Sequence, residues 1–328
     1  MQPLLWNLVE LDTHHYWHDC PSDELVRHPN SRLLLSLMRQ PDLGLSVKAF
    51  SFEYASYLLL GWQKLNVIRQ RNDHISGDGY WSEMISAKPE LSHLHPEDSP
   101  HKNASYWTST NYLLTCLPNL RSLKLLCFAS SPKASHIYCL SDIFLSQLAD
   151  LQSLTELSLV WQGTKVFDFD RLVKLFLLPA LRVLYLSGLI FDERYANHEE
   201  DPDIVPSVPI ELRRKSKIKT LILDFMNVDS GPLIALLQLP AGLETFTHSY
   251  TSDKSINSKV SPGRVYDLLY PHRSTLQHLH LVGHRDVPIR RPFPGRCAEE
   301  ILKNFRSLKF LGCPAQTLKS HRTVAQNL

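Results

Sequence analysis

The sequence predicts an α/β fold in which short parallel strands stack side by side and a helix leads from each strand to the next. Two observations favour this fold. One apolar spacing recurs along the chain, and a candidate helix lies in each interval between its copies. The length of 328 residues is also large for one ordinary compact core, which favours an elongated or repetitive one.

The recurring spacing is an apolar residue followed at +3 and +5 by two more. The clear copies are Leu120-Leu123-Leu125, Leu154-Leu157-Leu159, Leu181-Leu184-Leu186, Ile218-Leu221-Leu223 and Leu276-Leu279-Leu281. The weaker copies are Val47-Phe50-Phe52, Leu243-Phe246-His248 and Phe305-Leu308-Phe310. About eight copies exceed the roughly three repeats that a self-supporting stack needs.

The last two apolar positions of each copy point to the same face of a strand, because side chains alternate along it. One strand this short cannot bury its apolar side alone, whereas stacked parallel neighbours can. Residues 47–328 are therefore expected to form an irregular leucine-rich-repeat solenoid of about eight repeats. Its curved parallel sheet would carry the helices on the convex side.

The intervals between strands contain the helices that would cover the other side of the sheet. They are expected at Leu140–Leu151, Phe169–Leu178, Pro232–Leu239, Arg264–Tyr270 and Ala298–Phe305. Pro179 and Pro240 would end two of them. Residues 1–46 are expected to form a helical N-terminal cap, with a helix over Asn30–Arg39 that ends before Pro41.

Composition restricts the function classes. Lysine plus arginine (35) nearly balance aspartate plus glutamate (33), so general affinity for nucleic acid or anionic membranes is not expected. The six cysteines form no CxxC pair, which favours reduced, buried thiols. Residues 1–17 make a poor signal peptide, and Pro179, Arg182 and Gly188 interrupt the most apolar stretch. We expect a cytoplasmic or nuclear protein.

No P-loop, GxGxxG, GxSxG or HExxH motif is present, so neither catalysis nor a cofactor is predicted. Two histidine clusters leave open a metal-dependent enzyme or zinc protein: His14, His15 and His18 with Cys20, and His278, His280 and His284. The basic segment Arg285–Arg296 leaves open nucleic-acid binding. His248 falls at a core-facing repeat position, where a hydrogen-bonded buried histidine is expected.

The strand residues that do not face the core would form one concave surface. Its central row would contain Ser51, Lys124, Ser158, Tyr185, Ile222, Thr247, His280 and Lys309, and the neighbouring row includes Glu156, His278 and Ser307. Mixed charge with exposed aromatic and aliphatic groups suits a protein interface. The residues predicted to bind a protein partner are Lys124, Glu156, Ser158, Tyr185, Ile222, Thr247, His278 and His280.

The segments LPNLRSLKLL, LPALRVLYLSGL and STLQHLHLVGH resemble the leucine-rich repeats of fungal F-box proteins. RLLLSLMRQPDLGLSVKAFSFEY (Arg32–Tyr54) is similar to the passage that follows the F-box in that family. The resemblance implies a non-enzymatic substrate receptor of a ubiquitin ligase. No F-box is visible in residues 1–30, so contact with the cullin-ligase adaptor is expected only if an upstream extension encodes one.

Overall fold

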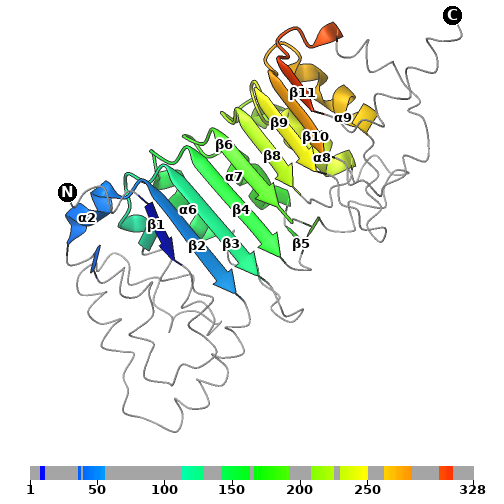
Figure 1. Ribbon diagram of the computed structural model, residues 1–328. Helices are drawn as coiled ribbons and strands as arrows, with labels where there is room; N and C mark the ends of the chain where they lie inside the picture. Colours follow the sequence, from blue (N-terminus) through cyan, green and yellow to red (C-terminus); the bar gives the residue numbers. More distant parts are fainter. Residues whose placement is uncertain are drawn as a thin grey trace, which may run out of the picture. The chain divides into compact units, whose positions relative to one another are not determined.

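The computed structural model describes residues 8–11, 36–37, 40–55, 113–128, 142–162, 166–167, 169–188, 190–191, 208–224, 230–249, 262–282 and 303–312. The chain divides into two compact units. The first unit contains Met1–Thr155 with Gln162–Thr164, and the second contains Glu156–Trp161 with Lys165–Leu328. Each unit is an α/β structure with parallel strands (Figure 1).

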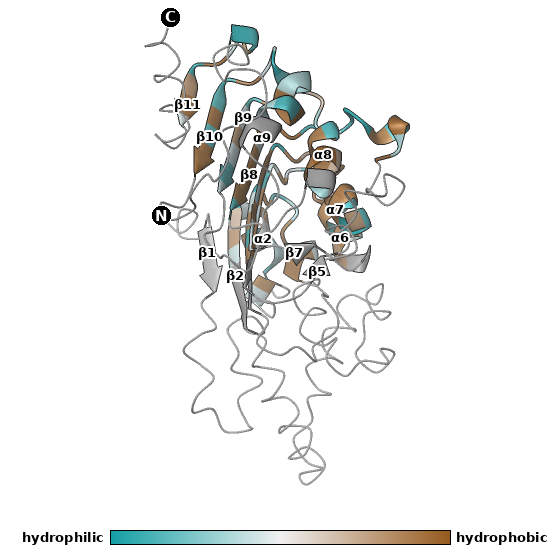
Figure 2. Cartoon of the chain, turned by 90° about the vertical axis from the view of Figure 1, so that its right-hand side faces the viewer, coloured by the Kyte–Doolittle hydropathy of each residue, from teal (hydrophilic) through white to brown (hydrophobic). Residues whose placement is uncertain are grey.

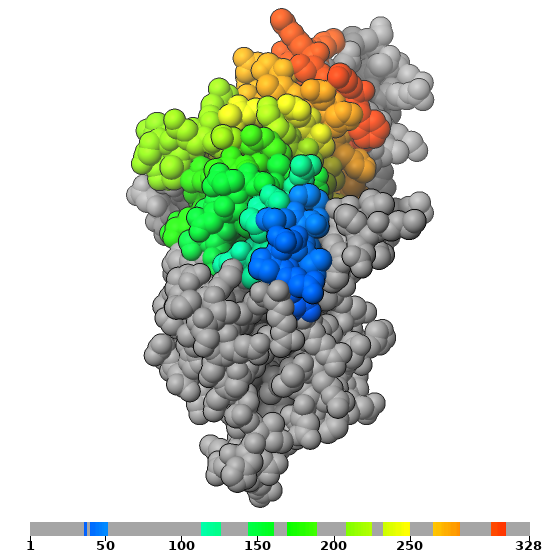
Figure 3. All heavy atoms as spheres, turned by 90° about the vertical axis from the view of Figure 1, so that its left-hand side faces the viewer, coloured from blue at the N-terminus to red at the C-terminus, as the bar shows by residue number. Residues whose placement is uncertain are grey.

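The described residues of the first unit form three parallel strands in the order β1 (Leu8–Leu11), β2 (Ala49–Ala55) and β3 (Ser122–Phe128). Its described helices include α2 (Pro41–Ser46) and α6 (Asp142–Asp150). Figure 3 shows residues 40–51 in blue beside residues 113–125 in blue-green. Gly44 packs so closely on the carbonyl oxygen of Cys116 that a Cβ at residue 44 would overlap it, so this contact requires glycine.

The second unit contains a sheet of six described strands, all parallel. In spatial order they are β4 (Glu156–Gln162), β6 (Val183–Ser187), β8 (Thr220–Asp224), β9 (Thr245–Ser249), β10 (His278–Val282) and β11 (Phe310–Gly312). A separate two-stranded parallel sheet joins β5 (Val166–Phe167) to β7 (Ile190–Phe191), and the sequence pattern did not predict it.

Helices α7 (Phe169–Phe176), α8 (Ser230–Gln238) and α9 (Pro262–Leu269) lie on one side of the six-stranded sheet (Figure 2). Two 3-10 turns, η9 (Ile210–Leu212) and η10 (Tyr270–His272), lie in the connections between strands. The helices predicted at Leu140–Leu151, Phe169–Leu178, Pro232–Leu239 and Arg264–Tyr270 are thus confirmed, with end positions that differ by a few residues.

The core of the second unit is a column of aligned side chains, one from each strand. The register pairs Leu157 with Leu184, then Leu221, then Phe246, then Leu279. All five side chains are at most 1% exposed. In the first unit Phe50 pairs with Leu123 in the same way. The +3/+5 spacing therefore identified these inward positions correctly.

A turn precedes many of the strands and extends the repeat by one apolar position. In each turn, the N–H of the residue that begins the strand motif bonds to the carbonyl three residues earlier, at 3.0–3.4 Å. The pairs are Val47 to Gly44, Leu120 to Leu117, Leu154 to Leu151, Leu181 to Leu178 and Leu308 to Phe305. The repeat is thus longer than the three positions read from the sequence, and its first apolar residue ends the preceding helix or turn.

The last repeat lies three residues later than the sequence reading placed it. Phe310 pairs with His278 and Leu311 pairs with Leu279, so Leu311 takes the position in the core column that was assigned to Leu308. Phe310 is 51% exposed instead of buried. The error has a physical cause: Phe305 is buried like the first apolar residue of other turns, and it was read as the first residue of the strand motif.

Most of the predicted N-terminal cap lies outside the described residues and stays a prediction. The described parts of residues 1–46 are β1, residues 36–37 and the stretch from Gln40 through α2, and the strand at β1 was not predicted. The basic segment Arg285–Arg296 lies outside the described residues. No helix among the described residues is long and apolar enough to span a bilayer.

Candidate functional site

The face of the second unit's sheet opposite α7, α8 and α9 is called here the outer face (Figure 2). Its side chains alternate along each strand with the buried core positions. The strand register arranges them in two rows. The first row is Glu156, Val183, Thr220, Thr245, His278 and Phe310, and the second row is Ser158, Tyr185, Ile222, Thr247, His280 and Gly312.

Seven of the eight predicted binding residues belong to these two rows. Glu156, His278 and His280 are exposed, whereas the side chains in the middle of the second row are half-buried against one another. The eighth, Lys124, is exposed on β3 of the first unit and pairs in register with Ser51. The predicted residues of the second unit thus form one continuous layer across neighbouring strands.

Lys309 and Ser307, which the sequence placed in these rows, lie in the turn before β11. Phe310 and Gly312 occupy the row positions instead. Lys309 donates from Nζ to Oε1 of Gln277 at 2.9 Å, and the hydroxyl of Ser307 donates to the carbonyl of Ser274 at 2.6 Å. Both residues therefore belong to the edge where the strands begin.

Tyr185 is fixed on the outer face by a carboxylate of the next strand. Its hydroxyl donates to Oδ2 of Asp224 at 2.8 Å. Partial burial and the hydrogen bond to Asp224 raise the pKa of Tyr185 above its usual value of 10.0, so the phenol is neutral at physiological pH. Sequence reasoning missed Asp224, although it lies two residues after Ile222 and so on the same face.

An aromatic cluster occupies the outer face at β10 and β11. The rings of His278 and His280 lie 6.3 Å and 6.1 Å from the ring of Phe310, the second pair edge-to-face. The imidazole of His280 lies where a Cβ on Gly312 would be, so the missing side chain at Gly312 makes room for it. Phe310 was not among the predicted binding residues, because the shifted register had placed it in the core.

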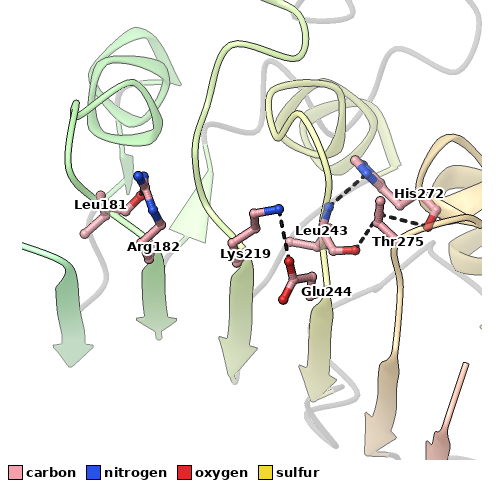
Figure 4. A network of polar contacts seen from close by, with 7 residues as sticks. All are labelled: Leu181, Arg182, Lys219, Leu243, Glu244, His272 and Thr275. Atoms are coloured by element: carbon pink, nitrogen blue, oxygen red, sulfur yellow. Dashed lines mark hydrogen bonds and ion pairs between the residues drawn. The ribbon is translucent and has the colours of Figure 1, made fainter. Parts of the chain in front are cut away.

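The edge at which the strands begin carries a repeated hydrogen-bond arrangement. The two N–H groups that enter a strand share one carbonyl of the preceding repeat, as Glu244 and Thr245 do with Lys219. The side chains of Lys219 and Glu244 form an ion pair at 3.0 Å (Figure 4). Both are more than 40% exposed, so this pair contributes little to stability.

Two histidines lie in the core of this unit. His248 is 1% exposed at its predicted core-facing position, and its Nδ1 lies 3.4 Å from the carbonyl oxygen of Leu223. Burial lowers its pKa to about 4. His272 is buried in η10, and its Nε2 donates to the carbonyl of Leu237 at 2.8 Å. Its Nδ1 accepts from the N–H of Leu243 at 3.3 Å (Figure 4).

The metal-site alternatives fall mainly outside the described residues. His14, His15, His18, Cys20 and His284 all lie there, as does the basic segment Arg285–Arg296. Within the part of the chain that the structure describes, no group of three or more histidine, cysteine, aspartate or glutamate side chains is arranged to hold a metal ion.

Neither the models of known protein families nor the curated proteins nor the solved structures contain a match to this chain. A functional proposal therefore depends on the residues of the chain and on their arrangement.

Proposed function

We propose that this chain is a non-enzymatic protein-interaction module of the leucine-rich-repeat type that binds a partner through the outer face. The observation that carries the proposal is the register of the six strands in the second unit. It brings Ser158, Tyr185, Ile222, Thr247 and His280 into one row, with Glu156 and His278 in the adjacent row.

The chemistry of the row suits a protein partner. Aromatic side chains carry much of the binding energy at protein interfaces, and aliphatic ones fill their dehydrated centres. Tyr185 offers an aromatic ring that Asp224 already holds in place, so less side-chain entropy is lost on binding. Ile222, its partner on β8, supplies a half-buried aliphatic surface beside it. Tyr185, Ile222 and His280 are therefore the residues expected to contribute most.

The resemblance to fungal F-box proteins supports a narrower proposal. In that form the chain is the substrate-binding part of a ubiquitin-ligase receptor, and its partner is a protein destined for ubiquitination. Contact with the cullin-ligase adaptor would require an F-box in a longer form of the chain. The proposal of a protein-binding outer face does not depend on this narrower role.

A pair of matched substitutions tests the outer face. Ile222→Asp places a charge in the row, whereas Ile234→Asp places the same charge at a half-buried position of α8, on the helical side of the sheet. Tagged wild-type and variant chains are used to purify partners, and thermal unfolding confirms that each variant folds. We expect Ile222→Asp to lose the recovered partner and Ile234→Asp to keep it. Recovery of no partner, or equal retention by both variants, would contradict the proposal.

A further inference from the structure

The edge of the second unit where the strands begin is strongly basic, although the chain as a whole is nearly neutral. The turns that precede the strands in this unit hold two acidic side chains, Glu211 and Glu244, among the described residues. The same turns, together with the helical residue Lys303 just before the last of them, hold ten basic ones. These are Arg182, Arg213, Arg214, Lys215, Lys217, Lys219, Arg273, Lys303, Arg306 and Lys309. All ten are exposed except Arg182, which is half-buried, and together they are called the basic edge.

Hydrogen bonds join neighbouring turns of the basic edge. Arg214 donates from Nη2 to the carbonyl oxygen of Pro271 at 3.0 Å, which ties the turn after η9 to η10. Ser307 donates to the carbonyl of Ser274, which ties the turn before β11 to the turn after η10. Arg214 adopts a positive φ of 58°, a conformation that non-glycine residues rarely occupy. The backbone N–H of Arg214 bonds to the carbonyl of Gln238 at 2.9 Å, which supports this turn.

Two large apolar side chains are exposed on the same turns. Ile210 in η9 is 79% exposed and Tyr270 in η10 is 43% exposed. The guanidinium of Arg273 lies 4.3 Å from the centre of the Tyr270 ring, so one face of the ring is already covered by a cation. The basic edge therefore offers both positive charge and apolar surface. In Figure 3, residues 208–224 (yellow-green) and 303–312 (orange to red) both reach the surface.

We propose that the basic edge binds an acidic protein segment, one in which aspartate and glutamate residues flank at least one apolar side chain. Exposed lysines and arginines attract carboxylates, and an apolar residue of the segment would cover Ile210. This surface is separate from the outer face and gives the proposed module a second contact of defined chemistry.

Three observations favour a protein segment over a nucleic acid. Glu211 and Glu244 interrupt the row of cations that a phosphate backbone would follow. Arg273 covers a face of Tyr270 on which a base would have to stack. An exposed aliphatic side chain such as Ile210 has no role on a phosphate track, whereas it suits a protein contact.

The test measures binding of a fluorescein-labelled peptide in which glutamates and aspartates flank one leucine, by fluorescence anisotropy with the full chain. A peptide with glutamine and asparagine in place of the acids is the neutral control. We expect the acidic peptide to bind with an affinity that falls as salt rises, and the neutral peptide to bind at least about tenfold more weakly.

Two sets of charge reversals separate a local site from an effect of net charge. Lys215→Glu, Lys217→Glu and Arg306→Glu change the basic edge, whereas Lys48→Glu, Arg121→Glu and Lys174→Glu make the same charge change outside it, at two positions of the first unit and one of α7. We expect the first set to weaken binding by about tenfold or more and the second by less than about twofold.

A second pair of variants tests the apolar contact without a change in charge. Ile210→Ser is expected to weaken binding of the acidic peptide by about threefold to tenfold. Leu45→Ser, at an exposed leucine of the first unit, is expected to have no effect. Thermal unfolding of every variant shows that the fold is kept.

Three results would overturn the proposal. They are no binding of the acidic peptide by the wild-type chain, equal weakening by the two charge-reversal sets, or tighter binding of a single-stranded oligonucleotide that the first set abolishes. The Ile222→Asp variant is expected to bind the acidic peptide normally. Failure of the basic edge and failure of the outer face can therefore be told apart.

Discussion

Two regions of the second unit bury their interiors equally well but with different chemistry. In β6 and β8 every inward strand position is leucine, at 0% exposure. In β9 the inward strand positions are Phe246 and His248, and in η10 His272 is also buried. The interior of the first region is apolar, whereas the second contains two imidazoles, of which His272 makes hydrogen bonds through both ring nitrogens.

The difference shows that the interior of this unit can hold a polar ring whose two nitrogen atoms both find partners. His272 uses both ring nitrogens, one as donor to Leu237 and one as acceptor from Leu243. A carbonyl can only accept and an N–H can only donate, so the network selects the neutral form with its proton on Nε2. His272 thereby joins the end of α8 to the start of β9. The leucine-lined region has no comparable sensitivity to protonation.

The largest loss of stability is expected from a substitution in the leucine-lined region. Leu221→Ala removes a fully buried side chain from the middle of the core column, between Leu184 and Phe246. We expect the free energy of unfolding to fall by about 3–4 kcal/mol, as is typical of a buried leucine that leaves a cavity. Urea unfolding measures it. Ile222→Ala, next to it on the outer face, is the control, and a loss as large as that of Leu221→Ala would contradict the assignment of the two faces.

A smaller loss is expected when the imidazole of His272 is removed. His272→Ala leaves the carbonyl of Leu237 and the N–H of Leu243 buried without this partner, which should cost about 2 kcal/mol. Arg273→Ala, at the exposed neighbouring residue, should change stability by less than about 0.5 kcal/mol. If the two variants unfold at the same urea concentration, the hydrogen bonds of His272 do not support the fold.

The histidine-containing region should also make stability depend on pH. Burial lowers the pKa of His248 to about 4 and lowers that of His272, for which the nearby cation Arg214 is a further cause. Below pH 6.5 the unfolded chain therefore binds protons that the folded chain does not. The free energy of unfolding should be constant above that pH and fall as the pH drops below it, by up to about 1.4 kcal/mol per pH unit for each histidine, and the contribution of His248 extends down to about pH 4.

Urea unfolding at a series of pH values measures this dependence. The variant His272→Ala should show a shallower slope between pH 6.5 and 4 than the wild-type chain. A stability that does not change across this range would show that neither histidine is held neutral in the folded state.

The sequence predicted the parts of the fold that one spacing controls. The positions of Leu123, Leu184 and Leu221 followed from it, because an inward residue of a stacked strand must be apolar wherever it lies. The residues that depend on contacts between distant segments could not be predicted. Asp224 acquires its role from Tyr185 on another strand, and His272 acquires its role from two backbone groups more than 25 residues away.

The shifted last repeat shows a second limit of the spacing. Phe305-Leu308-Phe310 and Leu308-Leu311-Cys313 fit the +3/+5 rule equally well, since the turn residue and the strand residues have the same apolar character. Only the pairing of Phe310 with His278 decides between them. This pairing alters the predicted outer face, because Phe310 lies beside the two histidines and Lys309 lies on the basic edge.

The smallest change in stability is expected at His248. A substitution there tests whether leucine can replace this buried histidine. His248→Leu restores the repeat pattern and keeps the third inward position filled, while it removes a contact of 3.4 Å to the carbonyl of Leu223. That contact is long for a strong hydrogen bond, so the gain from apolar burial should exceed the loss. We expect about 1 kcal/mol of added stability near pH 7 and a larger gain at pH 5, because the leucine takes up no proton. Urea unfolding of the wild-type chain and the variant at both pH values measures this difference. A destabilised His248→Leu variant would show that this imidazole makes contacts that a leucine-lined repeat cannot replace.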